Sequence, residues 1–173
     1  KFDQWIVVDD VDPATPCTMG QEVVRPEPRW QKGENTQVRN MLAALDRVQG
    51  DVVFVIEDDD WYHPMYLGEM LHALDNVFVA GEAHAAYYHP PFQEYCRHTN
   101  GTHASLFQTC FRRGLLPQFR RAVEASLPLI DIGFWAMVMF GEVPHRLSIT
   151  NRPLSVGMKG LPGRAGITQS HKG

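Results

Sequence analysis

The sequence predicts an α/β protein in which a central, mostly parallel sheet is covered by helices on both faces. Two apolar runs, residues 5–8 and 52–56, lack the alternation of a half-exposed strand, so both should be buried on both faces. A segment with apolar residues at helical spacing, 38–48, separates them. Each run ends in acidic residues, and in such folds ligands bind beyond the carboxyl ends of the strands.

The first strand, 5–8, ends in Asp9 and Asp10. Residues 12–28 are rich in proline and polar side chains, so they predict a loop, with a short ribbon at 21–24.

A helix should follow this loop. Asn35 or Thr36 is the expected N-cap, and the helical spacing over 38–48 stops at Gly50. The second buried strand comes next and ends in Glu57-Asp58-Asp59-Asp60. The later predictions are a helix over 64–74, strands over 77–80 and 85–88, and helices over 105–113 and 130–139.

The composition narrows the class of protein. The 173 residues suit a single domain that needs no disulfide or zinc site for stability. A net charge of −4 argues against binding nucleic acid over the whole surface. The three cysteines are odd in number and have no CxxC spacing, which favours free thiols in a reducing, cytoplasmic setting. No apolar run approaches the ~20 residues of a membrane span.

Four consecutive acids at 57–60 are the strongest chemical signal in the chain. Burying them unpaired would cost several kcal/mol each, so they must lie where the strand leaves the sheet. Carboxylate oxygens there suit Mg²⁺ or Mn²⁺, which bridges the phosphates of a nucleotide. A solvated acidic turn is the simpler alternative.

Three blocks in the first half of the chain share order and spacing with a known family. Residues 5–10 read Trp-Ile-Val-Val-Asp-Asp, Gly33 precedes Arg39-Asn40 in the first helix, and residues 50–64 join a strand, the acidic run and a proline. Together these blocks resemble the family 2 glycosyltransferases of the GT-A fold, whose metal motif is Asp-x-Asp. The family's first strand has no counterpart before Lys1, so we expect the chain to begin inside a longer protein.

The resemblance implies a single Rossmann-like GT-A domain over 1–173 that transfers a sugar from a UDP- or GDP-sugar, with inversion. The acceptor is open: a glycan, a protein, a small molecule or a modified nucleic acid. The resemblance assigns Mg²⁺ or Mn²⁺ to Asp58 and Asp60, while alignment on Pro64 favours Glu57 with Asp59. The donor contacts that it implies are Asp9, Asp10, Arg39, Asp58 and Asp59.

Two further positions match the family less closely. Asp131, before an apolar helix, resembles the general base that acts on the acceptor hydroxyl, and a helix N-cap is the competing interpretation. His171 resembles a C-terminal metal-binding histidine, and a solvated residue is the alternative for it. Residues 153–173 form a glycine-rich tail or lid, in which Lys159 and Arg164 would neutralise the diphosphate.

Other functions remain open at this point. An aspartyl phosphatase is disfavoured, because Trp61 and Tyr62 follow the acids where that motif requires Thr or Val. A nucleotidyltransferase would show a Gly-rich first loop containing arginine, which this chain lacks. A non-catalytic nucleotide-sugar or glycan-binding module would keep the acids and dispense with the function of Asp131.

Overall fold

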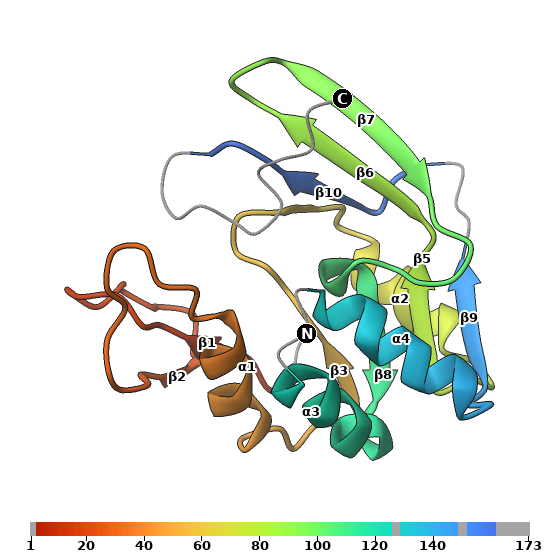
Figure 1. The fold of residues 1–173 in the computed structure, drawn as a ribbon, viewed down its shortest axis with the longest axis horizontal. Helices are drawn as coiled ribbons and strands as arrows, with labels where there is room; N and C mark the ends of the chain where they lie inside the picture. Colours follow the sequence, from red (N-terminus) through yellow and green to blue (C-terminus); the bar gives the residue numbers. More distant parts are fainter. Residues whose placement is uncertain (1–2, 126–128, 149–151, 162–173) are drawn as a thin grey trace.

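The computed structural model describes residues 3–125, 129–148 and 152–161 (Figure 1). The helices are α1 (Gln37–Leu45), α2 (Tyr66–Ala73), α3 (Leu116–Glu124) and α4 (Ile130–Phe140). The strands of the first half are β1 (Ile6–Val8), β2 (Glu22–Val24), β3 (Val52–Phe54), β4 (Trp61–Tyr62) and β5 (Val79–Glu82). Those of the second half are β6 (His84–His89), β7 (Glu94–Thr99), β8 (Thr109–Arg112), β9 (His145–Ser148) and β10 (Ser155–Met158).

The strands form three hydrogen-bonded groups. The central group has the order β3-β8-β5-β9, and a second group has the order β4-β10-β6-β7. β1 and β2 pair in parallel as a third group at one end of the molecule (Figure 1). In the second group β10 runs antiparallel to β4 and parallel to β6. It therefore joins β4, which directly follows the acidic run at 57–60, to the β6–β7 hairpin.

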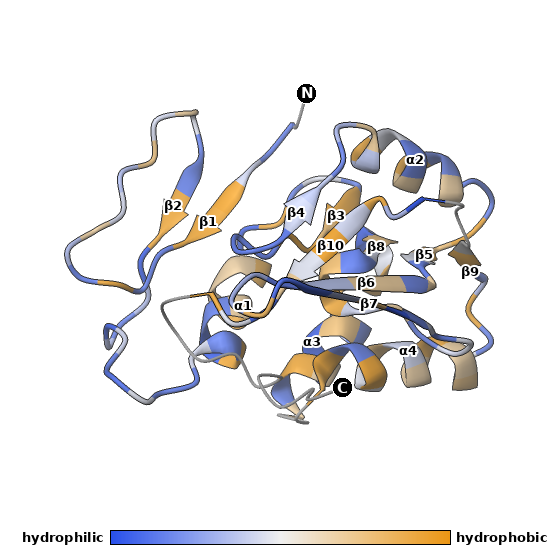
Figure 2. Ribbon diagram, turned by 90° about the horizontal axis from the view of Figure 1, so that it is seen from above, coloured by the Kyte–Doolittle hydropathy of each residue, from blue (hydrophilic) through white to orange (hydrophobic). Residues whose placement is uncertain are grey.

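The central group is covered by helices on both faces, as the sequence predicts. α2 lies on one face, and α3 and α4 lie on the other (Figure 2). Successive residues of the strands alternate between the two cores: Phe111 and Val79 pack with α3 and α4, whereas Cys110 and Ala80 pack with α2. This alternation explains why β3 is apolar without interruption, and it confirms the α/β class. β1, expected to be buried on both faces, is instead half-buried and pairs with β2 in a separate sheet.

The pairing is mixed rather than mostly parallel, which corrects one part of the prediction. β8 is antiparallel to both β3 and β5, while β5 and β9 are parallel. The cause lies in residues 105–113, which the sequence predicts as a helix. They form a 3₁₀ turn (Leu106–Gln108) followed by β8. The apolar spacing of residues 105–113 fits a short helix, but a short buried strand can produce the same spacing. Here hydrogen bonding of β8 to β3 on one side and β5 on the other favours the strand.

The remaining predicted elements are present with bounds that differ by a few residues from the predicted ones. α1 begins after Thr36, as expected, but it ends at Leu45, several residues before Gly50. The proline at 64 precedes α2, which starts at Tyr66. Residues 155–158, predicted as part of a loop-like tail, are the strand β10. Within the described ranges, no helix is both long enough and apolar enough to cross a membrane.

Candidate functional site

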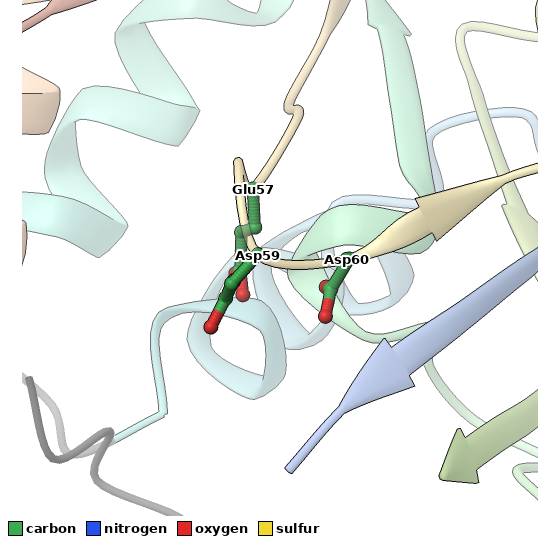
Figure 3. Close-up of side chains that lie close together, drawn as sticks. All are labelled: Glu57, Asp59 and Asp60. Carbon is green, nitrogen blue, oxygen red and sulfur yellow. The ribbon is translucent and has the colours of Figure 1, made fainter. Parts of the chain in front are cut away.

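The acidic run lies in the turn between β3 and β4, at the carboxyl end of β3. The backbone N–H of Asp60 donates to the carbonyl of Glu57 at 3.3 Å, which closes the turn. Glu57, Asp59 and Asp60 leave the turn on the same side (Figure 3). One carboxylate oxygen from each lies within 4.8 Å of the others, a spacing that allows a single cation to be shared.

Asp58, by contrast, does not join this group. It is exposed, and the group contains Asp60 but not Asp58 of the expected pair. The charge of Asp58 nevertheless reaches Asp60 and raises its pKa. Glu57 and Asp59, the alternative register, are both present with Asp60.

Asp60 is held in place by a strand that is distant in sequence. Its Oδ1 accepts a hydrogen bond from the backbone N–H of Met158 in β10, at 2.8 Å. Its Oδ2 is buried and has no hydrogen-bond partner among the described residues. An unsatisfied carboxylate oxygen costs free energy unless something binds it, and hard oxygen donors are the ligands that Mg²⁺ and Mn²⁺ prefer. The donor set therefore fits a divalent cation.

Burial and mutual repulsion make Glu57 and Asp60 hard to ionise. Burial together with the charges of Asp60 and Asp59, against a lowering by Lys159, raises the pKa of Glu57 to about 7. Burial likewise raises the pKa of Asp60 to about 6, opposed by the Met158 hydrogen bond. A cation bound between the carboxylates would favour the charged forms and reverse both effects.

Lys159 and Tyr87 line the same site. The Nζ of Lys159 lies 5.2 Å from the centre of the Tyr87 ring, and its charge lowers the pKa of both Glu57 and Asp60. The hydroxyl of Tyr87 is hydrogen-bonded to Ser105 Oγ at 2.8 Å. Lys159 thus brings positive charge to the acids, and its role at a diphosphate stays a prediction.

Asp131 lies in the first turn of α4, where Leu129 rather than Asp131 is the N-cap residue. Its Oδ1 accepts the N–H of Ile132 at 2.9 Å. Burial raises the pKa of Asp131, and the hydrogen bond from Ile132 and the charge of His103 lower it. The charge of Asp131 in turn raises the pKa of Glu57, so the expected base and the acid group share one electrostatic environment.

The two acids after β1 have separate partners. Asp9, 6% exposed, accepts the backbone N–H of Thr15 at 2.9 Å and pairs with Arg25 at 3.2 Å, so it organises its own loop. Asp10, 3% exposed, accepts Asn40 Nδ2 at 2.8 Å and lies 3.6 Å from Arg39 Nη2. The structure therefore brings together Asp10 and Arg39, two of the expected donor contacts.

Sequence reasoning missed several supporting groups. The Tyr62 hydroxyl accepts the Glu57 N–H at 2.9 Å, and only its place directly after the acids could have pointed to it. No sequence signal marks the backbone N–H of Met158, because any residue provides one. The expected groups Arg164 and His171 lie outside the described residues.

Comparison with protein-family models gives a match over most of the chain. No curated protein matches the chain. The family model described as glycosyl transferase family 2 matches residues 3–140, a range that includes β1, α1, the acid group and α4. Because this match spans well over half of the sequence and agrees with the α/β architecture, the chain belongs to glycosyl transferase family 2.

Proposed function

We propose that this chain is the catalytic core of a metal-dependent, inverting glycosyltransferase that uses a nucleotide-diphosphate sugar. One observation carries the proposal: three carboxylates within 4.8 Å of one another share an electrostatic environment with Asp131. Family membership supports a glycosyltransferase in general. The acid group supports the more specific part, because a cation site at a strand end suits a diphosphate.

Glu57, Asp59 and Asp60 would hold Mg²⁺ or Mn²⁺, in place of the Asp58 and Asp60 pair. When bound, the ion supplies positive charge that stabilises the departing nucleoside diphosphate. Lys159 adds positive charge at the same place. Arg164 and His171 stay candidates for the diphosphate and the ion.

Asp10 and Arg39 would contact the nucleotide, since they meet at the carboxyl end of β1, while Asp9 would shape the loop beside them. Asp131 would accept the proton of the acceptor hydroxyl as that oxygen attacks the anomeric carbon. Its raised pKa suits this task, because a base is most effective when its pKa approaches the working pH. A single displacement of this kind inverts the configuration at the anomeric carbon.

The test is thermal stabilisation by Mn²⁺, by UDP or GDP, and by each pair. We expect metal and nucleotide together to raise the melting temperature more than either alone, because they bind as one unit. Asp60→Asn should abolish this gain. Asp58→Asn is the matched control, an exposed acid of the same turn, and should keep it.

Equal stabilisation of the Asp60→Asn variant would contradict the proposal. Radiolabelled donor then separates the remaining possibilities. Metal-dependent transfer or donor hydrolysis supports the enzyme, whereas tight binding without turnover would indicate a non-catalytic nucleotide-sugar-binding module.

A further inference from the structure

Glu82, the last residue of β5, is a carboxylic acid with no exposed surface that lies outside the proposed chemistry. Its Oε1 accepts the backbone N–H of Leu154 at 2.7 Å. Its Oε2 accepts the hydroxyl of Ser155 at 2.8 Å and the side-chain amide of Gln108 at 3.2 Å. Among the described residues, no salt bridge involves Glu82.

Burying an ionisable acid of this kind costs free energy of folding. Burial raises the pKa of Glu82, and the three hydrogen bonds lower it again without a cation to balance the charge. Apolar residues at such positions are often as stable or more stable. The contacts of Glu82 show what the acid provides instead, because two of its three donors are Leu154, which directly precedes β10, and Ser155, the first residue of β10.

Few other contacts fix the position of β10 along its neighbours, among them the hydrogen bond from the His63 N–H to Leu154 O at 2.8 Å and the packing of Gly157 against Tyr87. β10 shares only two residue pairs with β4 and two with β6. A slip by one residue would turn each side chain to the opposite face, and short strands poor in large apolar residues resist such slips weakly. Glu82 belongs to the central sheet and accepts hydrogen bonds from Leu154 and Ser155. It therefore determines which residues of β10 pair with β4 and with β6.

The register of β10 determines where two residues that contact or face the acid group lie, Met158 and Lys159. Met158 donates its backbone N–H to Asp60 Oδ1 at 2.8 Å. Lys159 donates its backbone N–H to Tyr88 O at 2.9 Å, which places its side chain over Tyr87. A shift of β10 by one residue would remove the hydrogen bond that aims Asp60 and would displace the charge of Lys159.

We infer that Glu82 is a positioning residue: through Leu154 and Ser155 it fixes the register of β10 and thereby orients Asp60 and Lys159 for the proposed metal–diphosphate site. The inference rests on the proposed function, since it assigns a role to the strand beside the proposed ligands. Glu82 contacts neither Asp60 nor Lys159 directly and acts on them only through the backbone of β10.

Two substitutions at Glu82 separate positioning from charge. Glu82→Gln keeps the shape and an oxygen for the N–H of Leu154. Its amide can donate to Ser155 Oγ. Rotation of the Gln108 amide would present Oε1, which has no partner among the described residues, and would give up the hydrogen bond from Gln108 to His84 O. Glu82→Leu removes both acceptors at similar volume. Ser155→Ala removes one donor only, and it serves as a milder variant should Glu82→Leu fold poorly.

Two measurements on the full chain test the inference. Mn²⁺ affinity with UDP or GDP present should fall at least ten-fold in Glu82→Leu, fall less in Ser155→Ala, and stay near wild type in Glu82→Gln. Amide hydrogen exchange at Met158 should accelerate at least ten-fold in Glu82→Leu and remain slow in Glu82→Gln. Val123→Ala, a core substitution in α3, is the control for destabilisation alone and should leave both readouts unchanged.

The outcomes distinguish failure of this inference from failure of the proposed glycosyltransferase function. If the wild-type protein binds no Mn²⁺ with either nucleotide, the proposed function is overturned. Amide hydrogen exchange at Met158 in the variants then still decides whether Glu82 fixes the register of β10. Wild-type exchange at Met158 in both Glu82→Leu and Ser155→Ala overturns the inference. A ten-fold loss of affinity in Val123→Ala would also overturn it, since any loss of stability would then suffice.

Discussion

Asp131 and Glu57 are both partly buried acids whose pKa is raised first of all by burial, yet their surroundings suit different tasks. Glu57 shares its turn with two other carboxylates, an arrangement that suits binding of a cation. Asp131 stands at the start of a helix, with His103 as the cation that lowers its pKa. A lone acid with a raised pKa is suited to accept a proton.

We expect Asp131→Asn to reduce sugar transfer by roughly 10²–10⁴-fold, the usual contribution of a general base. Donor and Mn²⁺ binding should persist, because the amide keeps the shape and an oxygen for the N–H of Ile132. Turnover with a labelled donor, beside isothermal titration with Mn²⁺ and nucleotide, measures both. Asp75→Asn, a surface acid paired with His72, is the control. Unchanged turnover in Asp131→Asn would leave Asp131 a structural residue.

The pKa of Glu57 predicts how the metal-free protein responds to pH. Because folding raises this pKa from 4.5 to about 7, the folded state binds the proton more tightly than the unfolded state. The contribution to stability is complete below about pH 4.5 and is lost as the pH rises through 7. Asp60, raised from 3.8 to about 6, acts in the same direction.

Glu57→Gln should therefore show a smaller fall in melting temperature than wild type between pH 5 and pH 7.5, when both are measured in chelator. Saturating Mn²⁺ should reverse the trend in wild type, because the ion requires the deprotonated acids. Differential scanning fluorimetry across this range provides the comparison. A constant difference between the two proteins at every pH would show that Glu57 does not titrate there.

At the scale of single elements, β10 lies close against the Tyr87 ring. A side chain at Gly157 would meet Tyr87 Cδ1 at 2.6 Å and Phe107 Cζ at 3.2 Å, so only glycine allows β10 to approach this near. The closeness of this backbone to Tyr87 also fixes where Lys159 reaches the acids.

Gly157→Ala should lower the free energy of unfolding by about 1–3 kcal/mol through overpacking and should weaken the stabilisation by Mn²⁺ and nucleotide. Gly68→Ala is the matched control, because nothing lies within 4 Å of the added methyl group in α2. There the substitution should stabilise the protein by up to about 1 kcal/mol through helix propensity. Urea denaturation of both variants gives the values. Similar effects from the two would mean that β10 can move aside freely.

The elements that the sequence predicts correctly are those whose own pattern is long or uninterrupted. α4 is apolar over its length, and β1 and β3 are continuous runs that end in acids. The helix predicted over 105–113 was wrong, because β8 is a run of three buried residues and the half-buried Arg112, carries no alternation and follows a 3₁₀ turn. β10 was missed because its glycine and serine have low strand propensity, and partners far along the chain hold it in the sheet.

The site was predictable to a similar degree. Local order and spacing were enough to locate Asp10, Arg39 and the acid run. They could not decide between Asp58 and Glu57, because that depends on which way each side chain leaves a turn of four residues. Glu82 carried no signal, since a single acid in a short apolar segment has no pattern around it.

At the scale of the whole molecule, three aromatic rings lie in the core on the face of the central sheet that α3 and α4 cover. The ring centres of Phe111, Phe119 and Phe134 lie 4.9–5.1 Å apart, and all three side chains are fully buried. They join β8, α3 and α4 into one core. The start of α4, which carries Asp131, depends on this core for its place.

Phe134→Ala should cost about 3–5 kcal/mol, a large part of the ~5–15 kcal/mol that stabilises a typical domain. Phe140→Ala, in the same helix but 89% exposed, should change stability by less than about 0.5 kcal/mol. Chemical denaturation followed by tryptophan fluorescence measures both. If the two variants unfold at the same denaturant concentration, the aromatic core is not the main support of α4.

The hydrogen bond between Met158 and Asp60 joins positions 98 residues apart. The two ends of that stretch must find each other in the unfolded chain, and such distant contacts form slowly and late. During synthesis at ~5–20 residues per second, the acidic turn leaves the ribosome several seconds before its partner strand exists. The proposed cation site would therefore report on the completion of folding: if it binds Mn²⁺, a refolding chain should gain its helices first and its affinity for the ion last.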